Sequence, residues 1–187
     1  MKLHIFNPEN DLALADGRPG FTAPASARQM RSELYWLPEW WADEGDRVWD
    51  GEEPLHLNPG DEIVPWGWSP ALIHQLRKAG ADDSFLPSDE EMHSLRALSN
   101  RRTAVEALKH LRADGVAGEW ICGESEVCST LEQLDICRQR WPHTLLKAPW
   151  SSSGKGRMPD TDPHFHAWAK RIIRQQGSVV AERWLYK

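Results

Sequence analysis

The residues best suited to chemistry lie between Leu145 and Arg157, where a short apolar segment runs into serines, glycines and cations. Lys147 stands at the end of the apolar segment, which predicts a strand that ends in a cation. The small residues that follow are Ser151, Ser152, Ser153, Gly154 and Gly156. Small residues let a backbone come close to a ligand, and serial N–H groups and hydroxyls donate hydrogen bonds to anions. The stretch therefore predicts either a phosphate-binding loop or an ordinary solvated loop.

Two familiar phosphate-binding motifs are absent from the sequence. A P-loop requires Gly-x-x-x-x-Gly-Lys followed by Ser or Thr. Here Gly154 and Lys155 are followed by Gly156, and Pro149 occupies the position five before Gly154. The first predicted strand is not followed by Gly-x-Gly-x-x-Gly, so the dinucleotide-binding fingerprint is missing as well.

Composition excludes several classes of protein. The 187 residues are 40% apolar and 27% charged, with a formal net charge of -6. Nucleic-acid binding proteins usually carry a basic surplus, so we expect no nucleic-acid partner. No stretch approaches the roughly 18 apolar residues of a membrane span, so we expect no membrane partner. The three cysteines are odd in number and form no Cys-x-x-Cys pair, which predicts a cytoplasmic protein without a disulfide framework or a zinc site.

A polar loop follows the first predicted strand, which covers residues 2–6. It contains Asn7, Glu9 and Asp11. In open α/β sheets, ligands bind beyond the carboxyl ends of strands, so this loop is a candidate for contact with a substrate. The alternative is that Asn10 or Asp11 caps a short helix and has no further role.

The first half of the chain alternates strands with helices. We predict strands at 2–6, 46–49 and 62–64, and helices at 24–37 and 69–80. Ser69 and Pro70 supply the N-cap and the first helical residue of the second helix, and Gly80 ends it. This alternation is typical of a parallel-sheet domain. We therefore expect residues 1–95 to form a Rossmann-like α/β domain.

The second half has a different order of elements. Ser88 and Glu91 form a capping box that begins one helix, and a second helix covers 100–112. We then predict strands at 119–122 and 126–128, followed by a helix that begins with a capping box at 129–132. A strand at 144–146, a helix capped by residues 162–163 and a strand at 178–185 complete this half. We expect residues 96–187 to form a second, α+β domain.

This order of elements resembles the first nucleotide-binding lobe of the ATP-grasp family. The Asn100-Arg101 step is similar to the family's Asp-Lys junction, in which the cation reaches the nucleotide phosphates. Lys147 matches the strand lysine that contacts the α- and β-phosphates. Residues 151–156 match the flexible loop that closes over the β- and γ-phosphates. By this resemblance, Arg101, Lys147 and the loop bind ATP.

The final strand also resembles the family. Glu182-Arg183-Trp184-Leu185 is similar to the hinge of D-alanine–D-alanine ligases and their relatives, in which the backbone around the Glu and the Leu binds the adenine edge. The resemblance implies that Glu182 and Leu185 belong to the ATP site. It also implies that residues 1–95 are the α/β domain that precedes the ATP-grasp lobes and contributes to the acceptor site.

The sequence departs from the family pattern in two ways. Arginine stands where lysine is usual at the junction, which changes the geometry of its donors but not its charge. The chain also ends two residues after Leu185, whereas the family continues into a second lobe with the residues that bind the ribose and magnesium. We therefore expect a truncated chain, with ATP as cofactor and with Mg²⁺ needing the missing C-terminal lobe.

The resulting expectation is the ATP-binding portion of a carboxylate–amine ligase that is inactive by itself. Its partners would be a nucleotide and a small-molecule substrate. The alternative is a non-catalytic binding or interaction module, because eleven tryptophans are far more than usual for this length. In that interpretation the tryptophan-rich surface carries the function and the Gly/Ser segment is only a loop.

Overall fold

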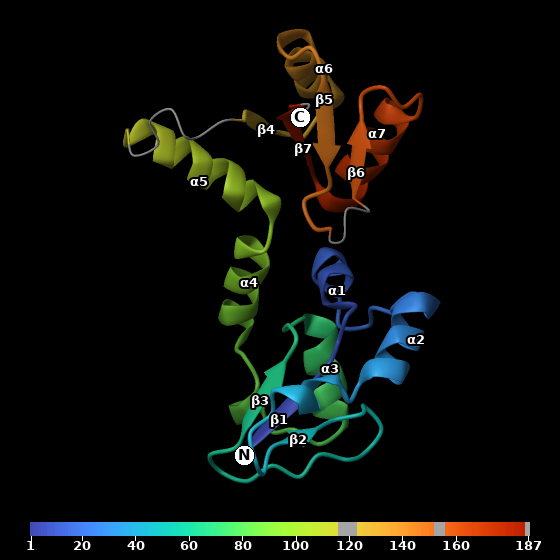
Figure 1. Ribbon diagram of the computed structural model, residues 1–187, viewed down its shortest axis with the longest axis vertical. Coiled ribbons are helices and arrows are strands. Elements are labelled where there is room, and N and C mark those ends of the chain that lie inside the picture. The colour runs from blue at the N-terminus through green and yellow to red at the C-terminus, as the bar shows by residue number, and fades with distance from the viewer. Residues whose placement is uncertain (116–122, 152–155, 186–187) are drawn as a thin grey trace. The chain divides into compact units, whose positions relative to one another are not determined.

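The computed structural model describes residues 1–115, 123–151 and 156–185 of the 187-residue chain. The chain divides into two compact units, Met1–Arg96 and Ala97–Lys187. The first contains a three-stranded parallel sheet and the second a four-stranded antiparallel sheet (Figure 1). The expected mixed α/β class is therefore confirmed.

The parallel sheet of the first unit has β1 (Lys2–Ile5) at its centre. Its neighbours are β2 (Arg47–Val48) and β3 (Glu62–Pro65), and each pairs with β1 in parallel. Parallel strands need long crossover connections, and in this unit the connection from β1 to β2 contains helices. The sheet of this unit is thus parallel, as the alternation in the sequence predicts.

The helix α3 (Pro70–Lys78) packs on this sheet. Its Leu72 and Leu76 are almost fully buried and share one apolar core with side chains from the strands. The other helices of the unit are α1 (Asn10–Asp16), α2 (Ala25–Leu34), the short 3₁₀ helices η1 (Leu37–Trp40) and η2 (Asp83–Phe85), and α4 (Asp89–Leu98), which continues two residues into the second unit.

Two predicted helix starts in this unit are confirmed. Ser69 Oγ accepts a hydrogen bond from Leu72 N at 3.3 Å, and Pro70 is the first residue of α3. Ser88 and Glu91 form the reciprocal pair of a capping box: Ser88 N donates to Glu91 Oε2 at 2.8 Å, and Glu91 N donates to Ser88 Oγ at 3.2 Å. Such pairs satisfy N–H groups that have no partner inside the helix.

The predicted cap of the first helix is wrong. The residue before α1 is Glu9, not Asn10 or Asp11, and its side chain makes no cap hydrogen bond. Glu9 instead forms an ion pair with Arg31, whose Nη1 lies 3.1 Å from Glu9 Oε1. Likewise Pro24 lies just before α2 and is not its first helical residue.

The antiparallel sheet of the second unit has the strand order β4-β7-β5-β6. Its strands are β4 (Ser125–Cys128), β5 (Thr144–Lys147), β6 (Arg157–Pro159) and β7 (Val179–Arg183). The sequence did not predict β6, which pairs Lys147 with Arg157 and so makes the Gly/Ser loop the connection of a β5–β6 hairpin.

The two faces of this sheet have different surroundings. One face packs on α6 (Leu131–Arg140) and α7 (Phe165–Gln176), and the largest buried residues of that core include Leu146 and Val179. Side chains alternate between faces along a strand. The opposite face, which we call the Lys147 face, is therefore defined by Leu145, Lys147, Val180 and Glu182. The remaining helix, α5 (Arg101–Ala113), lies against β4.

Two further details of the second unit correct the predictions. The N-cap of α6 is Thr130, whose Oγ1 accepts from Gln133 N at 3.3 Å, so the predicted cap at Ser129 is one residue off. The N-cap of α7 is His164, although Asp162 Oδ1 accepts from His164 N at 2.8 Å. The predicted strand at 119–122 lies outside the described residues.

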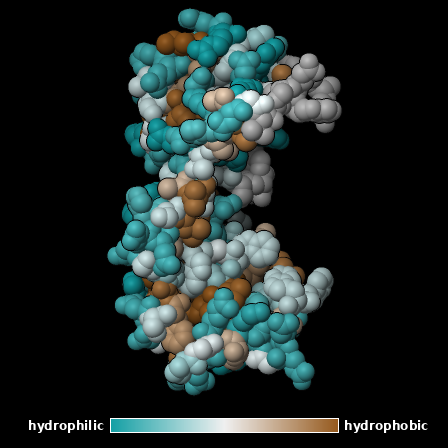
Figure 2. All heavy atoms as spheres, turned by 90° about the vertical axis from the view of Figure 1, so that its left-hand side faces the viewer, coloured by the Kyte–Doolittle hydropathy of each residue, from teal (hydrophilic) through white to brown (hydrophobic). Residues whose placement is uncertain are grey.

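The surface is mostly hydrophilic in the view of Figure 2, with apolar side chains gathered in smaller patches within each unit. No helix among the described residues has both the length and the apolar character needed to cross a membrane.

Two cysteines belong to the core of the second unit. Cys128 on β4 and Cys137 on α6 are buried free thiols with their Sγ atoms 3.7 Å apart. Burial, and next the neighbouring Cys137, raise the pKa of the Cys128 thiol from its ordinary 9.0 to about 12. The thiol stays protonated in the folded chain over a range where it ionises in the unfolded chain.

This pKa shift predicts a loss of stability at alkaline pH. The stabilisation by Cys128 is fully present below pH 9 and is lost as pH rises toward 12, because ionisation first favours the unfolded chain. We expect Cys128→Ala to lose less unfolding free energy than wild type between about pH 7 and pH 10, measured by urea unfolding. An equal loss in both proteins would contradict the buried, protonated thiol.

Candidate functional site

An ion pair on the Lys147 face joins two residues singled out in the sequence. In the register of β5 and β7, Leu145 lies opposite Glu182 and Lys147 lies opposite Val180. The Nζ atom of Lys147 is 2.5 Å from Glu182 Oε2, and the two side chains are 29% and 30% exposed. The structure thus brings the strand lysine and the hinge glutamate together, where solvent and a ligand can reach both.

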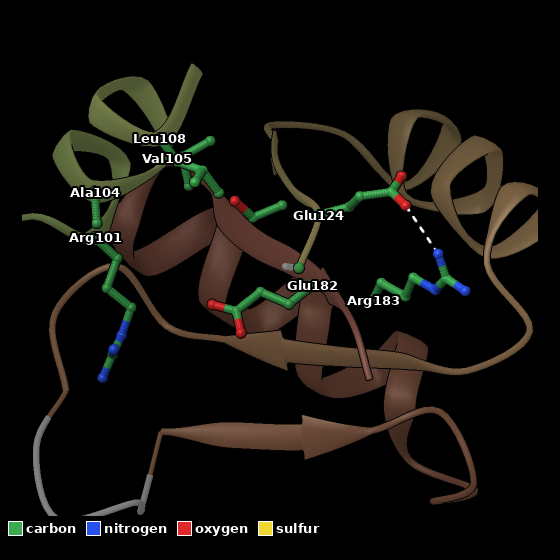
Figure 3. Close-up of a pocket in the computed structure, with 9 residues that line it drawn as sticks. Arg101, Ala104, Val105, Leu108, Glu124, Glu182 and Arg183 are labelled. Atoms are coloured by element: carbon green, nitrogen blue, oxygen red, sulfur yellow. Dashed lines mark hydrogen bonds and ion pairs between the residues drawn. The ribbon is translucent and has the colours of Figure 1, made fainter. Parts of the chain in front are cut away.

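Glu182 of this pair also lines a cavity of about 260 Å³ (Figure 3). Helix α5 supplies one wall, and β7, the start of β4 and the two residues before β4 supply the other. The lining residues are Arg101, Ala104, Val105, Leu108, Gly123, Glu124, Ser125, Glu182 and Arg183. Three aliphatic side chains of α5 face charged side chains from the sheet, so the cavity has an apolar wall and a polar rim.

Figure 3 shows how the charged side chains of this rim lie. Glu182 extends toward the Arg101 side of the cavity. Arg183, the next residue on the strand, points the other way and pairs with Glu124 at 3.0 Å. This divergence follows from the alternation of side chains along β7.

Arg101 holds the beginning of the Gly/Ser loop. Its Nε donates to Ala148 O at 3.0 Å, and its Nη2 donates to Ser151 O at 2.8 Å and Ser151 Oγ at 3.1 Å. Its backbone N–H also donates to Pro149 O at 3.0 Å. The two N–H groups on Nη1 have no hydrogen-bond partner among the described residues. Arg101 therefore anchors the start of the loop.

The other end of the loop is closed by Gly156. Ala148 N donates to Gly156 O at 2.7 Å. A Cβ atom on Gly156 would lie 2.2 Å from Ser151 Cβ, so a side chain cannot be accommodated here without moving the loop. Ser151 and Gly156 thus meet at the base of the loop, whereas Ser152, Ser153 and Gly154 lie outside the described residues.

The predicted hinge is part strand and part irregular segment. At Glu182, β7 is paired on both sides, with Ser125 of β4 and Leu145 of β5. Beyond the strand, Trp184 N donates to His143 O at 3.0 Å. Leu185 is 49% exposed and its backbone makes no hydrogen bond within the described part of the chain. Among the described residues, Leu185 is thus the predicted hinge residue whose backbone groups are unpaired.

Glu124 is a residue of the cavity that the sequence did not indicate. It accepts from Trp141 Nε1 and from Arg183 Nη1, each at 3.0 Å. The Trp141 indole N–H, and next the Arg183 guanidinium, hold the pKa of the Glu124 carboxyl below its ordinary value. These partners are 17 and 59 residues away in sequence, so no local pattern could have signalled the contact.

The three residues of the predicted substrate loop have separate surroundings in the first unit. Asn7 is 1% exposed and joins the ends of two strands: its Nδ2 donates to Gly67 O at 2.7 Å, and its Oδ1 accepts from Gly67 N at 3.3 Å. Glu9 is buried and pairs with Arg31. Asp11 is exposed on α1. The structure does not gather them into one cluster.

Comparisons with known proteins add no assignment: no protein-family model matches this chain, and no curated protein matches it either. Among the described residues, no group of three or more His, Cys, Asp or Glu side chains is arranged to hold a metal ion.

Two adjacent arginines test the anchoring of the loop. We expect Arg101→Gln to lower the free energy of unfolding by about 1–2 kcal/mol, because it removes charge-assisted hydrogen bonds to the loop. Arg102 is 59% exposed and only pairs with Glu106 across one helical turn, so Arg102→Gln should cost less than about 0.5 kcal/mol. Urea unfolding of both variants measures the difference, and equal costs would show that Arg101 does not hold the loop.

Proposed function

We propose that the second unit binds ATP as part of an ATP-grasp-like carboxylate–amine ligase. The observation that carries the proposal is the Lys147–Glu182 pair at the rim of the cavity under α5. It supplies a cation, suited to the phosphates of a nucleotide, next to a space with an apolar wall, suited to its base.

The phosphates would bind at Lys147. A phosphate oxygen competes with Glu182 for the ammonium group, and it brings more charge than one carboxylate. Arg101 supports the same end of the nucleotide, since its Nη1 donors are unused among the described residues and its other donors hold the loop. The Ser151 and Gly156 segment would then contribute hydroxyl and backbone donors to the phosphates.

The base would bind against α5. Ala104, Val105 and Leu108 line one wall, and flat aromatic rings pack well on aliphatic side chains. The cavity volume of about 260 Å³ suits a base and leaves the phosphates outside it, near Lys147. The backbone of Leu185 is suited to read the polar edge of the ring, because a backbone N–H and C=O can bind a base without a special side chain.

The reaction would follow the pattern of the resemblance. A substrate carboxylate oxygen attacks the γ-phosphorus of ATP, ADP leaves, and an acyl phosphate forms. An amine then attacks the acyl carbon and phosphate leaves, so an amide results. In this proposal the first unit is the Rossmann-like domain that precedes the ATP-grasp lobes. Mg²⁺ would accompany the ATP, because phosphoryl transfer uses the metal to offset charge on the phosphates.

A second candidate function has an observation of its own. Trp40, Trp41 and Trp66 of the first unit are 77%, 51% and 63% exposed. The rings of Trp41 and Trp66 are 6.5 Å apart between centroids. Exposed aromatic rings are typical of binding surfaces, so a non-catalytic interaction module is the alternative.

Binding of ATP distinguishes these two proposals. We expect the chain to bind ATP in the presence of Mg²⁺, and Lys147→Ala to weaken binding by about tenfold or more, because it removes a charge-assisted contact with phosphate. Isothermal titration calorimetry measures both affinities.

The matched control is Lys170→Ala, which removes an exposed lysine of α7 in the same unit. It should leave the affinity for ATP unchanged. Absence of binding by wild type at millimolar ATP, or equal affinities of wild type and Lys147→Ala, would contradict the proposal and favour the interaction module.

A further inference from the structure

The first unit contains a separate cavity of about 360 Å³. Its lining comes from the residue before α1, from the segment before α2 and one face of α2, from the segment after β2 and from α3. The residues are Glu9, Phe21, Thr22, Ala23, Arg28, Arg31, Ser32, Asp50, Gly51, Glu52 and Gln75. Ligand pockets begin at roughly 300 Å³, so this cavity is large enough for a small molecule.

Glu9 is the buried charged group of this cavity. Its side chain is 10% exposed, and one carboxylate oxygen, Oε1, accepts from Arg31 Nη1 at 3.1 Å. The other oxygen, Oε2, is buried and has no hydrogen-bond partner among the described residues. A carboxylate has about four lone-pair positions, and a buried one without donors is costly. Glu9 therefore has the capacity to accept from a further donor.

Arg31 is held in place around this carboxylate. Its Nη1 also donates to Gln75 Oε1 at 3.1 Å, and its guanidinium lies 6.0 Å from the centroid of the Trp49 ring. Gly51 has a φ of 98°, and a Cβ atom there would lie 3.0 Å from Arg31 Nη2. The arginine orients Glu9 from one side and is engaged on several others, so it does not supply the missing donor to Oε2.

The charges on the cavity wall favour a cation. The acids Glu9, Asp50 and Glu52 outnumber the two bases, Arg28 and Arg31. Part of the donor capacity of Arg28 is used locally, because its Nη1 donates to Ala23 O at 2.8 Å. The excess of acid and the unused oxygen of Glu9 both suit a group that carries several N–H donors and a positive charge.

We propose that this cavity binds the primary ammonium group of a small molecule, with Glu9 as its acceptor. An ammonium group offers three donors and pairs with a carboxylate through charge-assisted hydrogen bonds. The ligand is either a simple amine or an amino acid, and in the second case Arg28 is the residue suited to its carboxylate. The site lies wholly within the first unit, so it does not rest on the binding of ATP by the second.

The experiment is calorimetric titration of the full chain with matched probes and no nucleotide. The amines are ethylamine, ethanolamine and cadaverine, and the corresponding amino acids are L-alanine, L-serine and L-lysine. The α-N-acetyl derivatives of L-alanine and L-serine, and N-acetylethanolamine, keep the rest of each molecule but remove the charge. We expect at least one pair to bind, with the acetylated form weaker by about tenfold or more.

Comparison of each amine with its amino acid identifies the source of the ammonium group. Tighter binding of the amino acid, lost in Arg28→Gln, supports an amino acid as the ligand. Equal or tighter binding of the amine supports a simple amine. Failure of all probes to bind at millimolar concentration, or equal binding of the acetylated forms, would overturn the proposal.

Two pairs of variants locate the site. Glu9→Gln should weaken binding about tenfold, whereas Glu39→Gln, at an exposed residue of η1 outside the cavity, should not. Because Glu9→Gln also alters the pair with Arg31, Ser32→Trp gives a second test by filling the cavity from α2. Ser26→Trp adds the same ring on α2 outside the lining and is its control. Binding that survives both Glu9→Gln and Ser32→Trp would contradict the assignment.

Discussion

The two-residue alternation along paired strands β5 and β7 is the constraint on which the second unit depends. Leu146 and Val179 must enter the core under α6 and α7, because their burial stabilises the sheet. The register of β5 and β7 then fixes the face on which the neighbouring residues lie. Lys147 and Glu182 have to lie on the other face, and a one-residue shift of either strand would turn the charged residue of that strand toward the core.

Three described cations near the proposed nucleotide site have internal partners in the ligand-free chain. Lys147 pairs with Glu182, Arg183 pairs with Glu124, and Arg101 holds the loop. A partly exposed ion pair is worth about 1 kcal/mol or less, whereas hydrogen bonds to charged groups contribute about 1.5–3 kcal/mol. In the proposed site, phosphate would displace the Glu182 carboxylate from Lys147 at the cost of one partly exposed ion pair. In the proposal Arg101 differs, because its bonds to Ala148 and Ser151 would persist while its Nη1 donors, unused among the described residues, contact the ligand.

The sequence predicted best where the signal and its partner lie within one turn of helix. Ser69 with Pro70, and Ser88 with Glu91, were identified because an N-cap acts on N–H groups two or three residues away. The sequence does not discriminate between caps where neighbouring residues offer equivalent groups. Thr130 caps α6 in place of Ser129, and the local pattern has no means to choose between two adjacent hydroxyls.

Contacts between distant residues account for most of what the sequence did not show. Glu124 meets Trp141 and Arg183 only after β4 and β7 pair. The strand β6 is three residues long and contains a proline, so its pairing with β5 determines it and its composition does not. The pairing of Glu9 with Arg31 likewise spans 22 residues, which is why the sequence placed Glu9 only in a candidate substrate loop and did not show it as the buried carboxylate of a cavity.

Protection of Lys147 by nucleotide is the most direct test of the central claim, that phosphate binds where Glu182 now pairs with this lysine. Acetic anhydride labels accessible lysines in proportion to their exposure and free amine, and mass spectrometry reads the label at each position. With ATP and Mg²⁺ present, we predict that labelling of Lys147 falls several-fold while that of Lys170 and Lys78 is unchanged. Equal labelling of Lys147 with and without saturating ATP would contradict the account.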